Sequence, residues 1–121
     1  MPGELDVVLK RFEQPDELRT FPKGRFELVK LGGRTFGRAT YQPGWRWSVD
    51  VGPGVGKRLC DVEHIGLVLA GRATAAFDDG RVIVLEPGML FHIGATPHDS
   101  WVVGDEEYVS LHFLGAEAHN R

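Results

Sequence analysis

The chain has 121 residues, a formal net charge of -3 and a single cysteine, Cys60. This length suits one compact domain with its own apolar core, and a lone cysteine excludes an internal disulfide. The interleaved charges, with no basic stripe, argue against a nucleic-acid partner. No apolar run approaches the roughly 18 residues of a membrane span, and the first residues lack the features of a signal peptide, so a cytoplasmic protein is expected.

The first third of the chain predicts short strands separated by turns. Residues 5–12 are compatible with a first strand, and a proline followed by acidic residues at 15–19 is typical of one helical turn. A turn is expected at 22–24. Apolar and polar residues then alternate through 25–31 and 34–42, which predicts two further strands.

Residues 45–51 carry the clearest alternation in the chain. Trp45, Trp47 and the valines after them fall on one face, with polar residues on the other. This pattern predicts a strand whose two tryptophans fill much of a small barrel. The glycine-rich residues 52–57 are expected to form a loop.

The rest of the chain reads as a series of strands, one of them bent near Glu63. These strands are predicted at 59–69, 72–77, 81–85, 89–93, 99–103 and 108–113. Together with the earlier segments they make about nine or ten short strands with regular turns and no helical period. The expected fold class is therefore all-β, a sandwich or a barrel.

Several segments resemble the small single-domain cupins, in particular a poorly characterised bacterial group. The matching features are Pro-Gly-Trp-x-Trp-Ser at 43–48, Cys-x-x-x-His at 60–64, a strand–Gly turn at 68–71, and His-Asp-x-Trp-Val-Val-Gly at 98–104. The resemblance covers about residues 36–113. It implies a jelly-roll barrel, the double-stranded β-helix, formed by one domain spanning 1–121.

The resemblance also implies a metal site. The usual first cupin motif is His-x-His, a short spacer, then Glu before the glycine of the turn. Aligned on that glycine, the motif falls on Arg58, Cys60 and His64, and the histidine of the second motif falls on His98. Two of the four positions have changed residue type and arginine cannot bind metal, so the resemblance implies a site but no particular activity.

The residue chemistry supports the same three ligands. Cys60 and His64 are four residues apart and share a face of a continuous strand, and a jelly roll brings His98 alongside. One thiolate and two imidazoles suit a divalent metal, zinc above all, with a fourth position open. Thiolate disfavours magnesium and calcium, whereas iron and nickel stay in consideration. The competing interpretation is a polar pocket without metal.

A small-molecule ligand is expected beside this metal. Trp45, Trp47 and Trp101 are the candidate pocket walls, and Arg58 is the candidate partner of an anionic ligand at the pocket mouth. His112 is expected to be structural or exposed, because it shares its face with other polar residues of the last strand.

Three functional classes stay open. The first is a metal-dependent enzyme acting on a small organic molecule, for which Glu63 and His112 are the only spare general bases. The second is a non-catalytic module that binds or senses a metabolite and acts through a partner. A structural protein is a third class, and the edge strands of a small jelly roll predict a homodimer in each case.

Overall fold

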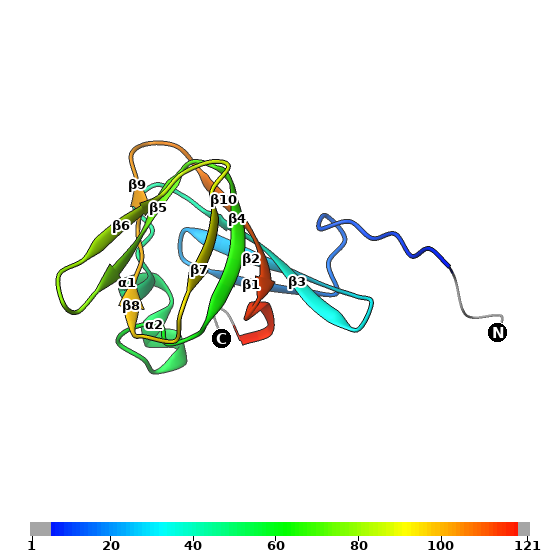
Figure 1. The fold of residues 1–121 in the computed structure, drawn as a ribbon, viewed down its shortest axis with the longest axis horizontal. Helices are drawn as coiled ribbons and strands as arrows, with labels where there is room; N and C mark the ends of the chain where they lie inside the picture. Colours follow the sequence, from blue (N-terminus) through cyan, green and yellow to red (C-terminus); the bar gives the residue numbers. More distant parts are fainter. Residues whose placement is uncertain (1–5, 119–121) are drawn as a thin grey trace.

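The structure, a computed structural model, describes residues 6–118 and is built almost entirely from antiparallel strands (Figure 1). The strands are β1 (Glu17–Phe21), β2 (Gly24–Leu31), β3 (Arg34–Tyr41), β4 (His64–Ala70), β5 (Arg72–Phe77), β6 (Val82–Leu85), β7 (Leu90–Ile93), β8 (His98–Asp99), β9 (Val102–Val103) and β10 (Tyr108–Leu114). Three short helices, α1 (Trp47–Asp50), α2 (Gly52–Val55) and the 3₁₀ helix η1 (Ala116–Ala118), complete the described fold. The predicted all-β class is confirmed.

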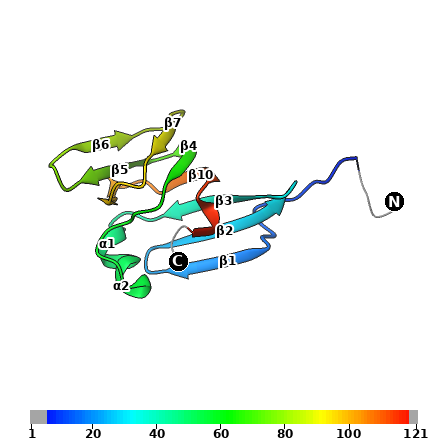
Figure 2. The same cartoon turned by 60° about the horizontal axis from the view of Figure 1, so that its bottom comes forward.

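The strands form two sheets that enclose the core. The larger sheet has the order β1-β2-β3-β10-β4-β7, and the smaller has the order β6-β5-β8, with β9 also paired to β5. Residues distant in sequence therefore become neighbours, because β10 lies between β3 and β4. Figure 2 shows α1 and α2 beside one end of the strands, and both views show the N-terminal segment leaving the body near β2 and β3.

The predicted strand at 45–51 is wrong, because the chain turns there into the single-turn helix α1. Asp99 decides this local structure: its carboxylate accepts hydrogen bonds from the Ser48 amide at 3.0 Å and the Ser48 hydroxyl at 2.7 Å. The Trp47 amide donates to the Ser100 carbonyl at 2.8 Å. Both tryptophans are still buried, so the apolar pattern located core residues but gave the wrong period.

The predictions for the N-terminal segment also fail. Residues 6–12 pair with no strand of the described chain, and Leu5 lies outside the described residues. The predicted helical turn at 15–19 is replaced by the start of β1, which pairs with β2. Asp16 anchors this segment, because its amide donates to Leu28 and its carboxylate accepts the Lys30 amide at 2.7 Å. Pairing with β2 overrides the local helical signal of the proline.

The strands predicted at 59–69, 81–85 and 89–93 are shorter in the structure, and the loop at 52–57 begins with α2. The strand predicted at 59–69 with a bend near Glu63 is not continuous, because β4 starts only at His64 and the chain bends earlier, at residues 58–59. The strand expected at 99–103 is divided into β8 and β9, with Trp101 between them. Among the described residues, no helix is long and apolar enough to cross a membrane.

Candidate metal-binding site

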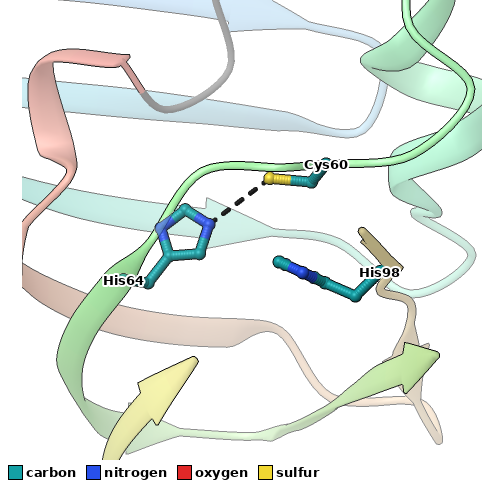
Figure 3. Close-up of side chains that lie close together, drawn as sticks. All are labelled: Cys60, His64 and His98. Carbon is teal, nitrogen blue, oxygen red and sulfur yellow. Dashed lines mark hydrogen bonds between the residues drawn. The ribbon is translucent and has the colours of Figure 1, made fainter. Parts of the chain in front are cut away.

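Cys60, His64 and His98 come together inside the barrel (Figure 3). One possible ligand atom from each of the three lies within 4.8 Å of the others, and each residue is buried. The Cys60 Sγ and His64 Nε2 atoms are 3.4 Å apart. His64 is the first residue of β4 and His98 the first of β8, while Cys60 lies in the segment between α2 and β4.

The backbone places two of these residues side by side. Cys60 and His98 form an isolated antiparallel bridge, in which each amide donates to the other's carbonyl at 2.9 Å. The His98 ring is also oriented by the chain, because its Nδ1 lies 2.9 Å from the Thr96 carbonyl and can only donate there. That hydrogen bond leaves Nε2 of His98 with its lone pair available to a cation.

Burial sets the protonation of the three side chains. It raises the pKa of the Cys60 thiol to about 11. It also lowers the pKa of His64 to about 4, helped by the nearby His98, and lowers the pKa of His98. At neutral pH the thiol is therefore protonated and both imidazoles are neutral, so a metal must displace one proton, that of the thiol.

The three side chains line an inner cavity of about 40 Å³. This volume exceeds what one water molecule needs. The remaining lining residues are mostly aromatic or apolar: Tyr41, Trp45, Trp47, Thr74, Leu85, Phe91, Ile93, Ser100, Tyr108, Ser110 and His112. The cavity is a small, mostly apolar space in which a few polar groups converge.

The aromatic wall is rigid on one side. The Trp45 ring stacks on Tyr41 with centroids 3.7 Å apart, and Tyr41 stacks on Tyr108 at 5.8 Å. The buried indole nitrogens of Trp45 and Trp47 have no hydrogen-bond partner among the described residues. Both tryptophans line the cavity, and their indole N–H groups are buried within its wall.

The other two predicted pocket residues lie elsewhere. The Arg58 side chain is 75% exposed and pairs with Asp78 at 3.1 Å. The chain bends at residues 58–59, so the alternation that would have put Arg58 beside Cys60 does not apply. The Arg46 guanidinium lies over the Trp101 ring, 4.4 Å from the ring centroid. Trp101 is three residues after His98, so it points to the opposite side of the chain and does not line the cavity.

His112 is the cavity residue that the sequence did not reveal. It is 5% exposed, its Nε2 lies 3.0 Å from the Ser110 hydroxyl, and its ring centroid is 5.6 Å from that of His64. Burial lowers its pKa to about 3. Its cross-strand partners are Gly37 and Gly66, where a side chain would collide with the rings of Phe26 and Phe91 that pack against His112. The only sequence signal was alternation in 108–113, which separates two faces without saying which is inside.

Glu63, the other spare general base, points away from this site. It is exposed, and its carboxylate lies 2.7 Å from Nε2 of His92 on the outside of the barrel. The bend before β4 therefore does not carry Glu63 inward.

By sequence, no protein-family profile and no curated protein matches this chain. Its structure is similar to a protein of unknown function from Rhizobium leguminosarum, with a TM-score of 0.63, 16% identity, and coverage of 89% of this chain and 95% of that one. A cupin-2 domain protein from Rhodospirillum rubrum aligns with a TM-score of 0.55 and 17% identity over 91% of this chain and 68% of that chain.

An oxalate decarboxylase from Lactobacillus farciminis, solved as a formate complex, aligns with a TM-score of 0.59 and 16% identity over 97% of this chain. The match spans 36% of that longer enzyme. At these identities the similarity concerns the fold. Together with the two antiparallel sheets and the buried Cys/His/His cluster, it shows that this chain has the all-β, jelly-roll fold of the cupins.

Proposed function

We propose that this chain binds one divalent metal ion, zinc above all, through Cys60, His64 and His98, and holds a small molecule at the remaining coordination position. The observation that carries the proposal is the convergence of three buried donor atoms within 4.8 Å inside a cupin barrel. The backbone bridge and the Thr96 hydrogen bond hold two of the donors in place without any metal.

The donor set suits zinc. In a tetrahedral site with Zn–S of about 2.3 Å and Zn–N of about 2.0 Å, sulfur and nitrogen lie roughly 3.5 Å apart. The separation of 3.4 Å between Cys60 Sγ and His64 Nε2 agrees with this value. A thiolate with two neutral imidazoles also disfavours magnesium and calcium, whereas iron and nickel remain the alternatives to test.

The first candidate activity is a metal-dependent reaction on a small organic molecule. A bound metal supplies polarisation of a carbonyl group or a lowered pKa for a water molecule. The aromatic wall, which includes Trp45 and Trp47, limits the access of bulk water to this site. The hydrogen-bonded pair of Ser110 and His112 is the candidate proton carrier, because it lines the same cavity as the three ligands.

The small inner volume favours a second candidate, a non-catalytic module that binds a metabolite and acts through a partner. A cavity of about 40 Å³ leaves little room for two reactants. Turnover separates the two candidates. A molecule that raises the melting temperature of the zinc form and is recovered unchanged supports the binding module.

Metal analysis of the untagged protein, purified from metal-replete cells, tests the metal site. The expected result is about one equivalent of zinc in the wild type and below about a fifth in Cys60→Ala and His98→Ala. His92→Ala is the matched control, because it removes an exposed histidine of β7 and should leave the metal content unchanged. Less than about a tenth of an equivalent in the wild type, or full occupancy in both cavity variants, contradicts the proposal.

We also propose a homodimer formed through the outer face of the larger sheet. The β4 segment Ile65–Ala70 is a nearly continuous apolar run, which is typical of strands covered on both faces. In the single chain, Ile65, Leu69 and the β10 residue Phe113 remain 38–47% exposed on the side away from the cavity. A second copy packed there would bury them.

A further inference from the structure

A second, larger cleft opens between the edge strands of the two sheets. In the described chain β7 ends the larger sheet and β6 ends the smaller one. The cleft between them has a volume of about 510 Å³. This volume falls within the range of roughly 300–1,000 Å³ that is typical of small-molecule sites. Phe77, Ile83, Leu85, Phe91 and Ile93 supply most of its inner wall.

The cleft borders the inner cavity that holds the candidate metal ligands. Leu85, Phe91 and Ile93 line both spaces. Phe77 adds a direct contact, since its ring centroid lies 5.9 Å from that of His98. Only the side chains of this shared wall therefore separate the cleft from the space lined by Cys60, His64 and His98.

The charges around the cleft are already paired. The Arg81 guanidinium contacts the Asp79 carboxylate at 2.7 Å and lies over the Phe77 ring, 4.7 Å from its centroid. His92 is paired with Glu63 at 2.7 Å. Arg81 is the only arginine or lysine, and His92 the only histidine, among the residues that line this cleft. The cleft therefore favours a ligand body without charge.

We propose that the cleft between β6 and β7 binds the apolar body of the ligand, while a single small polar head group enters the inner cavity and meets the metal. This inference rests on the proposed metal site. The ligand class is a neutral aromatic or branched aliphatic molecule with one compact metal-binding group, such as a thiol, hydroxyl or carbonyl. A dicarboxylate or a phosphorylated sugar does not fit, because its second charge finds no free counter-charge.

Three probes test this division of the site on the zinc-loaded full-length protein. Benzyl mercaptan has a zinc-binding head and an apolar body, 2-mercaptoethanol has the same head without the ring, and 4-(mercaptomethyl)benzoate adds a charge to the ring. Titration calorimetry should give benzyl mercaptan an affinity at least about tenfold above that of each other thiol, because its ring is buried without an unpaired charge.

Substitutions on β6 identify the cleft as the source of this preference. Ile83→Glu puts a carboxylate in the cleft at a position that is 48% exposed, so the fold should tolerate it. It should lower the affinity for benzyl mercaptan at least about tenfold and leave that for 2-mercaptoethanol unchanged. Val82→Glu is the matched control, since this neighbour is 51% exposed and lies outside the cleft lining.

The outcomes separate the two proposals. If zinc binds but the three thiols bind equally, or if both β6 variants behave alike, the cleft is not the ligand site and the metal proposal stands. If zinc does not bind, both proposals fail. If Ile83→Glu converts a dimer into a monomer in sedimentation while Val82→Glu does not, the cleft is an interface between copies, which overturns its role as a ligand site.

Discussion

Cys60 and His98 exchange two backbone hydrogen bonds of 2.9 Å, so the thiol and the imidazole are held together by main chain alone. The two residues are 38 positions apart, and their bridge is isolated and not part of a longer strand pair. Because side chains play no part in the bridge, a substitution at Cys60 or His98 can leave it intact. Metal affinity and folding can therefore be altered separately.

Cys60→Ser should remove metal binding while keeping the fold. The serine can make the same backbone bridge, but a hydroxyl is a far weaker zinc ligand than a thiolate, so zinc affinity should fall on the order of 100-fold or more. Competition with a chromogenic chelator measures the affinity, and urea unfolding of the metal-free protein measures stability. An unchanged zinc affinity contradicts the role assigned to the thiolate.

Zinc affinity should rise with pH. The Cys60 thiol has a pKa raised to about 11, so it must lose its proton to bind metal throughout the physiological range. The pKa of His64 is lowered to about 4 and that of His98 is also lowered, so both rings stay neutral and release no proton at neutral pH. The apparent affinity should increase about tenfold per pH unit between pH 6.5 and 8.5. Calorimetry in buffers of different ionisation enthalpy should show one proton released; none released argues against thiolate coordination.

The metal-free protein should lose stability in mild acid. Burial lowers the pKa of His112 to about 3 from an ordinary value near 6.5. Between these two pH values the ring is protonated in the unfolded chain and neutral in the folded chain. Above about pH 6.5 this histidine does not reduce the free energy of unfolding. Below that pH it lowers the free energy of unfolding by roughly 1.4 kcal/mol per pH unit. His112→Gln, which can still hydrogen-bond to Ser110, should reduce the slope of unfolding free energy between pH 6.5 and 5. An identical slope in the variant contradicts the assignment.

Asp99→Ala should destabilise the fold and disturb the tryptophan wall. The buried carboxylate accepts hydrogen bonds from Arg46, from the amide and hydroxyl of Ser48, and from the Ser100 amide. Losing these bonds should cost about 1–3 kcal/mol in urea unfolding. The intrinsic fluorescence should also change, because α1 carries Trp47 into the cavity. Asp78→Ala is the control: its exposed pair with Arg58 should contribute less than about 1 kcal/mol.

Leu69→Glu and Phe113→Glu should each shift the protein from dimer to monomer in sedimentation velocity experiments. Both side chains are exposed on the outer face of the larger sheet, where a charge would have to be buried in the interface. Leu18→Glu is the control, because Leu18 is also apolar and 54% exposed. It lies on the edge strand β1, which β2 and β3 separate from β10 and β4. A wild type that is monomeric at all concentrations contradicts the homodimer.

The sequence by itself determined the all-β class and most strand positions, because alternation and glycine turns are local signals. β2, β3, β5, β6, β7 and β10 all lie where this pattern predicts them. The spacing of Cys60 and His64, with the resemblance to cupins, also selected the three residues that converge in the barrel.

Only the tertiary structure decided what depends on partners distant in the chain. Asp99 turns the tryptophan segment into a helix, β2 makes a strand of the segment after Pro15, and Gly37 and Gly66 leave room for rings that bury His112. Arg58 lies outside the site, because the chain bends at residues 58–59 and its side chain pairs with the distant Asp78. The alternation expected from the local sequence therefore does not hold there. A periodic pattern separates two faces of a strand, but packing against other strands decides which face becomes the interior.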